Sequence, residues 1–387
     1  MNRLFIALLI LLLLPLVAVA KDDEGETFEV VNPGAHATAV KVIALDAKVG
    51  GKFAVAGPDG KDVPAWWDKD AKKLLVLASV PAGGGTFTVV DGAKSKARDP
   101  KWGKPKIKKE DKVKLGKTVE RVSGEFQNDL LKVTVPVENT VHGRVRIEAL
   151  KGKYKLELSP LGCSAGCVET EGIGKEVDKS YAAGQQVHDE VFVIYPSIAT
   201  KIEVLEPNPF QRTMRVQCYA WARKNNEKTL DLFDEASFEI TLTWGSPVVK
   251  IHSLRKLKTT YWNHNGVDLN EIYIEQQPPS IQADDEEKAT ERVVTGNVLD
   301  IPFKKSIWLK DKTGATVVHQ PDFDTLKIYK ECMVLAKDRL MTILSQSWHE
   351  GWKPIEIKAG DYADTMTLAC DVGDDDKTLK DWVTELR

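Results

Sequence analysis

The stretch Phe238-Glu239-Ile240-Thr241-Leu242-Thr243-Trp244 decides the fold class of this sequence. Apolar and polar residues alternate along it without interruption, and a period of two is the period of a β-strand, whose successive side chains point to opposite faces. We therefore predict a strand with one buried face and one face in water. The segments Tyr154–Leu158 and Met214–Cys218 repeat this pattern.

The rest of the chain extends this β pattern in both directions. Gly57-Pro-Asp-Gly60 and Asn265-Gly266 are turn signals, because Gly and Asn tolerate a positive φ. Long helical periodicity is scarce, and its best example is Asp376–Leu386, which begins with acidic residues and carries an apolar stripe. We predict an all-β fold with a small N-terminal β domain, a large antiparallel β-sandwich and a short C-terminal helix.

The N-terminus has the pattern of a secretory signal peptide. A basic Arg3 precedes an apolar run of about 17 residues that ends in Ala18-Val19-Ala20, a small-residue cleavage site. An uncleaved membrane anchor is the alternative, because the run is close to the shortest length that spans a bilayer. We expect cleavage after Ala20, a secreted or periplasmic protein, and no membrane contact after cleavage.

Composition predicts four segments. These are a signal peptide over 1–20, the small β domain over 21–93, a basic linker over 94–118, and the β-sandwich domain with its C-terminal helix over 119–387. Eleven Lys and Arg stand against three acids between Lys94 and Lys117, which indicates a solvated linker or a contact with an anionic polymer. Trp102, within this segment, is expected to dock onto a neighbouring domain, and Gln276–Arg292 is expected to be a loop.

Charge and cysteine usage exclude several classes of protein. The net charge is −3, which does not suit a dedicated nucleic-acid binder. Five cysteines are too few for a disulfide-built scaffold. Cys163 and Cys167 have three alternative states: a local disulfide, two free thiols, or half of a metal site. No second pair of Cys or His ligands lies nearby in the sequence, so we expect no metal. We expect no cofactor, because no Walker, dinucleotide or His-Glu-x-x-His pattern is present.

Two parts of the chain resemble a known family. The first comprises Asn32-Pro33-Gly34, Gly57–Ala65 and Leu74–Val90, and the second comprises Val204–Val216 and Phe238–His252. Together they resemble the two N-terminal β domains of exo-rhamnogalacturonan lyase-like proteins, a barrel-like domain followed by a sandwich of the galactose-mutarotase or supersandwich type. In that family an α/α toroid follows and is expected to supply much of the active site, whereas this chain ends at Arg387. The resemblance therefore implies a supersandwich-like fold and a carbohydrate context, and it assigns no catalytic residue.

Aromatic residues beside turns are the candidate ligand-binding residues. Sugar rings pack on flat apolar faces that have hydrogen-bonding groups beside them, and loops project such groups from a scaffold. Three clusters have this composition: Trp66-Trp67-Asp68, Tyr261-Trp262-Asn263-His264-Asn265 and Trp348-His349-Glu350-Gly351-Trp352. We name Trp66, Trp67, Trp262, Trp348 and Trp352 as ligand-binding candidates, with burial in the core as the alternative.

Catalysis by a polysaccharide lyase needs a base and a group that neutralises a uronate carboxylate. His264 with Tyr261, and His349 with Glu350, are candidates for the base. Arg212 and Arg215 are candidates to neutralise the carboxylate. An epimerase would use a histidine and a carboxylate, for which His252 and Glu239 are candidates. For each of these histidines a purely structural role is the alternative.

Three functions are consistent with these features. The leading hypothesis is a secreted glycan-binding or accessory protein of polysaccharide processing, whose partner is a polysaccharide or an oligosaccharide. The second is an enzyme, a polysaccharide lyase or a sugar epimerase that acts from the β-sandwich. The third is a non-catalytic structural or interaction protein of the cell envelope. The sequence names no protein partner.

Overall fold

The computed structural model describes the chain in segments. They are residues 19–22, 25–115, 117–136, 144–160, 167–169, 192–224, 228–230, 233–258, 261–263, 271–274, 280–284, 290–293, 299–303, 305–310, 313–323, 332–337, 340–344, 355–373 and 379–386. The chain divides into two compact units. The N-terminal unit comprises residues 1–101 with 208–210, and the C-terminal unit comprises residues 102–207 and 211–387.

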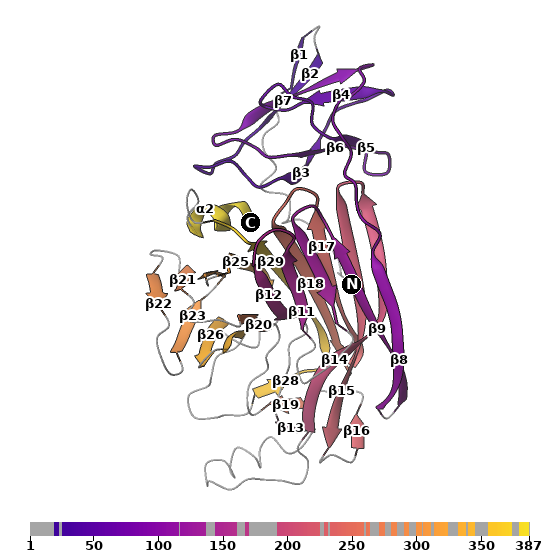
Figure 1. The fold of residues 1–387 in the computed structure, drawn as a ribbon, viewed down its shortest axis with the longest axis vertical. Coiled ribbons are helices and arrows are strands. Elements are labelled where there is room, and N and C mark those ends of the chain that lie inside the picture. Colours follow the sequence, from indigo (N-terminus) through magenta and orange to yellow (C-terminus); the bar gives the residue numbers. More distant parts are fainter. Residues whose placement is uncertain are drawn as a thin grey trace, which may run out of the picture. The chain divides into compact units, whose positions relative to one another are not determined.

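The N-terminal unit is built from two small antiparallel sheets around one core (Figure 1). The β2–β7 sheet has the strand order β1 (Val19–Asp22), β2 (Gly25–Val30), β7 (Gly85–Asp91) and β4 (Phe53–Ala56). The β3–β6 sheet has the order β3 (Lys41–Leu45), β6 (Lys73–Ala78) and β5 (Ala65–Asp68). Phe28 and Phe87 from the first sheet and Leu45 and Leu74 from the second fill the space between them.

The C-terminal unit contains two larger sheets. The β8–β12 sheet has the order β23 (Leu299–Phe303), β26 (Cys332–Lys337), β27 (Leu340–Leu344), β20 (Glu271–Ile274), β12 (Lys155–Ser159), β11 (Val145–Ala149), β10 (Leu131–Val135), β9 (Lys117–Gln127) and β8 (Lys106–Leu115). The β14–β18 sheet has the order β22 (Thr290–Val293), β21 (Ser280–Asp284), β24 (Ser306–Lys310), β25 (Ala315–Phe323), β29 (Gly360–Cys370), β18 (Val248–Leu257), β17 (Phe233–Thr243), β15 (Gln211–Lys224), β14 (Phe192–Asn208), β13 (Cys167–Glu169), β19 (Tyr261–Asn263) and β28 (Ile355–Ile357), and β16 (Lys228–Leu230) pairs with β15.

These two sheets face each other across one hydrophobic core, so the C-terminal unit is a β-sandwich. Val133 and Ile147 come from the β8–β12 sheet, and Met214, Ile240 and Leu368 come from the β14–β18 sheet. Burying apolar side chains contributes roughly 25 cal/mol per Å² of surface removed from water, which makes this shared core the main stabilising feature of the unit. The predicted all-β fold, with a small N-terminal part and a large antiparallel sandwich, is confirmed.

The strand that the sequence pattern singled out lies in the centre of the β14–β18 sheet. β17 begins five residues earlier than the quoted stretch, at Phe233, and ends at Thr243. Phe238, Ile240 and Leu242 are buried in the core, as the alternation predicts. β17 pairs in antiparallel register with β15 on one side and with β18 on the other.

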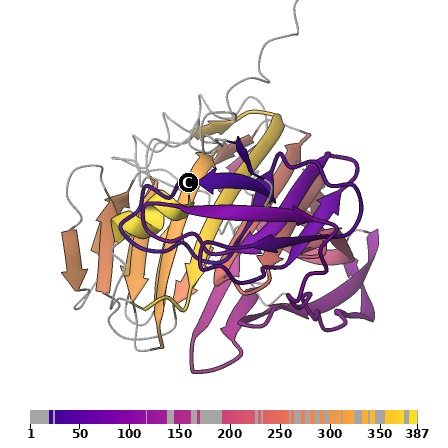
Figure 2. The ribbon, with the colours of Figure 1, turned by 90° about the horizontal axis from the view of Figure 1, so that it is seen from above.

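The C-terminal helix α2 (Leu379–Leu386) packs against β25 and β29 (Figure 2). Its Trp382, Val383 and Leu386 side chains are buried, which confirms the predicted apolar stripe. The three aspartates predicted to precede the helix lie outside the described residues.

Two segments differ from their sequence predictions. The end of the predicted linker is not free chain: residues 106–115 form β8, which pairs with β9. Lysine is compatible with an edge strand because its charge stays in water, so a basic composition does not exclude strand structure. Within the predicted loop Gln276–Arg292, β21 and β22 form an antiparallel pair with Ser280 opposite Val293.

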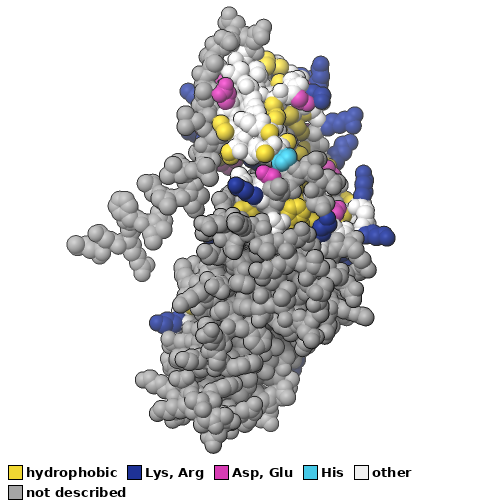
Figure 3. Space-filling model, turned by 90° about the vertical axis from the view of Figure 1, so that its left-hand side faces the viewer, with side chains coloured by type: hydrophobic (Ala, Val, Ile, Leu, Met, Phe, Trp, Pro, Cys, Tyr) yellow, Lys and Arg dark blue, Asp and Glu magenta, His cyan; other side chains and the backbone are white. Residues whose placement is uncertain are grey.

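The described residues contain no helix long and apolar enough to cross a membrane. β1 spans the predicted cleavage site, with Ala20 opposite Thr27 and Lys21 opposite Glu26. On the face shown in Figure 3, hydrophobic side chains of the described part reach the surface between polar groups, and Lys and Arg side chains project from it.

Candidate functional site

Five of the predicted site residues lie outside the described residues: His264, His349, Glu350, Trp348 and Trp352. Tyr261 and Trp262 lie in β19, whose backbone pairs with β13 and β28. The assignments of these seven residues stay predictions.

The Trp66-Trp67 pair separates onto two faces of β5. Ala65 and Trp67 pack against the core of the N-terminal unit. Because neighbouring residues of a strand point to opposite faces, Trp66 lies on the outer face of the β3–β6 sheet. Its side chain is half-buried, so part of the indole ring is accessible to solvent. The structure therefore gives Trp67 a core position and leaves Trp66 as a surface aromatic residue.

Trp66 belongs to a continuous apolar row on this outer face. It lies opposite Leu75 of β6, and Leu75 in turn lies opposite Ala44 of β3. Leu75 is half-buried and Ala44 is exposed. Cross-strand partners have Cβ atoms about 4.5–5.5 Å apart, so the three side chains form one flat apolar surface.

Charged groups border this row at one end. Asp68 follows Trp66 on the same face of β5 and lies opposite Lys73 of β6. Lys73 forms an ion pair with Asp46. One carboxylate oxygen of Asp68 accepts hydrogen bonds from the backbone N–H groups of Asp70 and Ala71, each at 3.0 Å, which fixes the orientation of the carboxylate. We call Ala44, Leu75, Trp66, Asp68 and Lys73 the Trp66 face.

Arg212 is engaged inside the C-terminal unit. Its side chain is almost fully buried, and its Nη1 donates a hydrogen bond to the Gly103 carbonyl at 2.5 Å while its Nη2 pairs with Glu206. The guanidinium carbon lies 4.9 Å from the Trp102 ring centre, and Trp102 meets Trp244 edge-on at 5.3 Å. Such cation–π and aromatic contacts stabilise packing, so the contacts of Arg212 fit a structural role.

Trp102 contributes to the same cluster. It packs against the hydrophobic core of the C-terminal unit, to which it belongs, as a half-buried side chain. Arg212 and Arg215, both candidates to neutralise a carboxylate, lie three residues apart in β15 and therefore on opposite faces. The two arginines do not form one anion site.

Arg215 lies instead in a polar row on the outer face of the β14–β18 sheet. Arg215 lies opposite Glu239, Glu239 lies opposite His252, and His252 lies opposite Thr365. Arg215 Nε donates to Glu239 Oε1 at 2.6 Å, and His252 Nδ1 lies 3.1 Å from Thr365 Oγ1. The structure thus brings together Glu239 and His252, the pair predicted for epimerase chemistry. His252 is exposed, and Arg215 and Glu239 are partly exposed.

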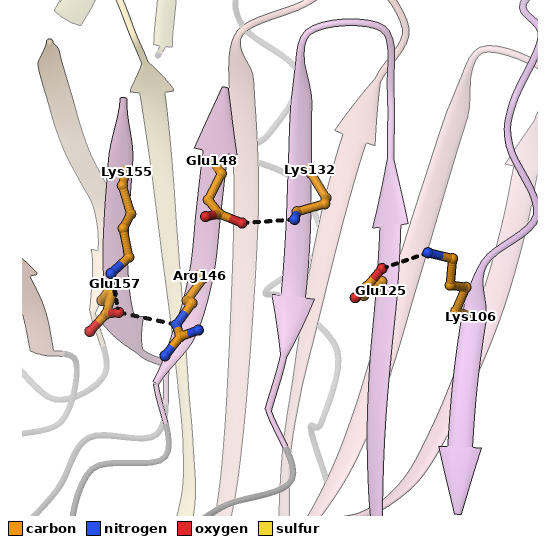
Figure 4. A network of polar contacts seen from close by, with 7 residues as sticks. All are labelled: Lys106, Glu125, Lys132, Arg146, Glu148, Lys155 and Glu157. Atoms are coloured by element: carbon orange, nitrogen blue, oxygen red, sulfur yellow. Dashed lines mark hydrogen bonds and ion pairs between the residues drawn. The ribbon is translucent and has the colours of Figure 1, made fainter. Parts of the chain in front are cut away.

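A ladder of charges covers the outer face of the β8–β12 sheet and was not predicted from the sequence. Lys106 pairs with Glu125 at 3.2 Å, Lys132 with Glu148 at 2.9 Å, and Arg146 with Glu157 at 3.1 Å (Figure 4). Alternating charges in runs such as Arg144-Val-Arg146-Ile-Glu148 are the sequence signal for such a ladder, but the pairing requires the register between strands.

Glu157 is the most enclosed carboxylate of this ladder. Burial on its own would raise the pKa of Glu157, but hydrogen bonds from Lys155 and Arg144 lower it below the ordinary value. Glu157 therefore stays ionised at neutral pH and holds three cations around it: Lys155, Arg144 and Arg146.

Within the part of the chain that the structure describes, no three His, Cys, Asp or Glu side chains gather in a group that could hold a metal ion. Among the described residues, Cys370 is a buried free thiol, and the pairing of Cys163 with Cys167 lies outside the described side chains.

Comparison with known proteins gives matches among solved structures. No family model matches the chain, and no curated protein matches it. An α-mannosidase from Enterococcus faecalis V583 is 11% identical, with a TM-score of 0.45 over 95% of this chain and 46% of that chain. A protein of glycosyl hydrolase family 38 from Enterococcus faecalis is 10% identical, with a TM-score of 0.46 over 95% of this chain and 47% of that chain.

A third solved structure is an α-galactosidase of glycosyl hydrolase family 36 from Geobacillus stearothermophilus. It is 9% identical, with a TM-score of 0.36 over 65% of this chain and 40% of that chain. The chain thus spans less than half the length of each of these three proteins, which are named as an α-mannosidase, a protein of glycosyl hydrolase family 38 and an α-galactosidase.

Proposed function

We propose that this protein is exported and binds glycans as an accessory protein of polysaccharide processing. The observation that carries the proposal is the Trp66 face. There a surface indole continues into a flat apolar row that ends at charged groups. A pyranose ring has the complementary surface, because its C–H groups form an apolar face while its hydroxyl groups form hydrogen bonds at its rim.

Two further features support this proposal. The Trp66 face lies on regular strands, which hold a binding surface more rigidly than loops do. The stretch Leu74–Val90, part of the resemblance to exo-rhamnogalacturonan lyase-like domains, includes most of β6, the middle strand of the face, with Leu75. Export is part of the proposal and rests on the signal pattern before Lys21.

Affinity electrophoresis of residues 21–387 tests the function and names the substrate class. We expect native gels that contain pectic, mannan, glucan or sulfated polysaccharide to retard the protein in at least one class. Trp66→Ala should weaken the retardation about fivefold, because an aromatic contact contributes about 1 kcal/mol.

The matched control is Val31→Ala, which also removes an exposed apolar side chain of the N-terminal unit. It should leave retardation unchanged. Equal retardation of the wild type and Trp66→Ala would remove Trp66 from the site. Normal mobility in every class would contradict glycan binding and favour a structural or interaction protein of the envelope.

A second candidate function, that of a lyase or epimerase, is favoured by one observation. His252 and Glu239 are direct cross-strand partners on a solvent-facing sheet surface, and Arg215 holds the carboxylate. His252 Nδ1 contacts Thr365, which leaves Nε2 as the nitrogen for proton transfer. Incubation with polygalacturonate tests both reactions: ultraviolet absorbance of unsaturated products reports the lyase, and uptake of deuterium from heavy water at the sugar C5, measured by NMR, reports the epimerase. Activity that His252→Ala abolishes would support the corresponding reaction, and activity that survives this change would exclude His252.

A further inference from the structure

Positive charge is concentrated in one short part of an otherwise acidic chain. Of the 54 Lys and Arg, 11 lie between residues 94 and 117, and of the 57 Asp and Glu, three lie there. The remainder of the chain therefore carries 43 basic residues against 54 acidic ones. A uniformly acidic protein repels polyanions, whereas a basic segment of this density attracts them locally.

The C-terminal half of this segment forms β8, an extended row of lysines. β8 has the sequence Lys-Ile-Lys-Lys-Glu-Asp-Lys-Val-Lys-Leu and is an end strand of its sheet in the described residues (Figure 1). At about 3.3 Å per residue, its ten residues extend over roughly 30 Å. A row of this length matches a linear polymer better than a compact anion.

The two acids of β8 are occupied by neighbouring side chains. Asp111 accepts two hydrogen bonds from the Arg121 guanidinium, and this pairing lowers the pKa of Asp111. Glu110 accepts a hydrogen bond from Ser123 at 3.1 Å. Lys106 and Lys109 pair with acids of β9.

Three lysines remain. Lys108, Lys112 and Lys114 are exposed, and none of them forms an ion pair among the described residues; Glu120, which lies opposite Lys112, pairs with Lys109 instead. Lys112 and Lys114 lie on one face of the strand because they are two residues apart. The register shifts between Lys109 and Lys112, so Lys108 is separated from this pair by an irregularity in the strand.

We infer that Lys108, Lys112 and Lys114 form a binding row for a linear polyanionic glycan, one that carries closely spaced sulfate or carboxylate groups. This inference deepens the proposed function and rests on it.

The composition of the hairpin favours a glycan over a nucleic acid. Proteins that bind single-stranded nucleic acid add aromatic stacking to their basic grooves. The only aromatic residue in β8 and β9 is Phe126, and its side chain is buried in the core. The row also consists of lysines, which act as point charges and lack the bidentate geometry with which arginine binds phosphate.

Dextran and dextran sulfate provide a matched test, because they share a backbone and differ in charge. We compare the Kd of residues 21–387 with that of a triple variant, K108Q/K112Q/K114Q. The control, K151Q/K153Q/K250Q, removes the same charge at three other exposed lysines of the same unit. The triple variant should bind dextran sulfate at least about tenfold more weakly at 50 mM NaCl, with a smaller difference at 200 mM because salt screens the charges.

Polygalacturonate distinguishes carboxylate from sulfate as the recognised group. Equal loss of affinity in the triple variant and its control would overturn the inference, because it would reflect net charge alone. Tighter binding of a single-stranded DNA oligonucleotide than of either polyanionic glycan would also overturn it.

The alternative role of these lysines is to prevent pairing of the edge strand with another chain. It predicts self-association of the triple variant in sedimentation velocity with unchanged glycan affinity, and that result would overturn the inference. A different result would contradict the proposed function itself: the wild-type protein would then be retarded by none of the glycans. If only the inference about the lysines is wrong, the wild type is retarded and the triple variant binds as its control does.

Discussion

Arg255 and Asp364 form an ion pair that is almost wholly removed from water. Arg255 Nη1 lies 2.8 Å from Asp364 Oδ2, and the two side chains are 5% and 1% exposed. The carbonyl of Pro160 accepts a hydrogen bond from Ser253 Oγ at 2.6 Å and lies 3.4 Å from Arg255 Nη2. Buried charges of this kind persist because each one compensates the other.

Asp364→Asn should therefore destabilise the protein strongly. The amide keeps the shape of the side chain but removes the negative charge that faces the buried Arg255 guanidinium, which costs about 3–5 kcal/mol. Urea unfolding of the two proteins measures the difference in the free energy of unfolding. Lys61→Ala, which breaks an exposed ion pair with Asp59, is the control and should cost less than about 1 kcal/mol. A cost below about 1 kcal/mol for Asp364→Asn would contradict this account.

Sequence pattern predicts which residues face the core but not which charges are enclosed there. Phe238, Ile240 and Leu242 follow directly from the alternation. Asp364 lies 109 residues from Arg255 in sequence, so its partner becomes visible only once β18 and β29 are in register. Trp66 and Trp67 were hard to distinguish for the same reason. They are neighbours in sequence and point to opposite faces of β5, but only the fold shows which of these faces is turned to the core.

At the scale of elements, the turn before β7 depends on glycine. Gly84 has φ +114°, and a Cβ built there would lie 2.6 Å from the Val30 carbonyl oxygen. Gly84→Ala should cost about 1–3 kcal/mol, because both the backbone conformation and the contact are unfavourable.

The control for this change is Gly51→Ala. Gly51 has no atom within 4 Å of an added Cβ, so its replacement should leave the urea midpoint unchanged or slightly raised. Equal midpoints for the two variants would show that the Gly84 turn can relax.

A buried thiol, that of Cys370, lies between the two sheets of the C-terminal unit. Cys370, the last residue of β29, lies in the core with Tyr154, whose hydroxyl also bonds Thr316 Oγ1 at 2.5 Å. Burial raises the pKa of the Cys370 thiol to about 12 and raises that of Tyr154 well above its ordinary value. The folded protein therefore retains protons that the unfolded chain releases.

The sign of the pH dependence follows from this difference. An unfolded cysteine has a pKa of about 8.5, so the contribution of Cys370 is fully present below that pH and is lost as pH rises towards 12. The free energy of unfolding should fall by about 1.2 kcal/mol more between pH 8 and 9.5 in the wild type than in Cys370→Ala. Parallel pH profiles of the two proteins in urea unfolding would contradict the assignment.

Two elements show why boundaries were harder to predict than fold class. The basic composition of 94–118 indicates a linker, yet pairing with β9 makes 106–115 a strand. The acidic and proline-rich 276–292 indicates a loop, yet β21 pairs with both β22 and β24. In each case the hydrogen bonds of a neighbouring strand override a weak local preference.

At the scale of the whole molecule, each of the two β-sheet units carries one of the surfaces proposed to bind glycans. The Trp66 face supplies an apolar contact in the N-terminal unit, and the β8 lysines supply charge in the C-terminal unit. The two surfaces are expected to make separate contributions to the free energy of glycan binding. Variants at one surface should therefore remove its contribution and leave that of the other surface unchanged.

Hydroxyl-radical footprinting of residues 21–387, read by mass spectrometry, tests whether the Trp66 face binds sugar. With saturating glycan of the class that retards the protein, oxidation of Trp66 should fall severalfold while that of Trp67, which packs on the core, stays constant. Unchanged oxidation of Trp66 in the presence of bound glycan, or the absence of any retarding glycan, would contradict the proposal that the Trp66 face binds sugar.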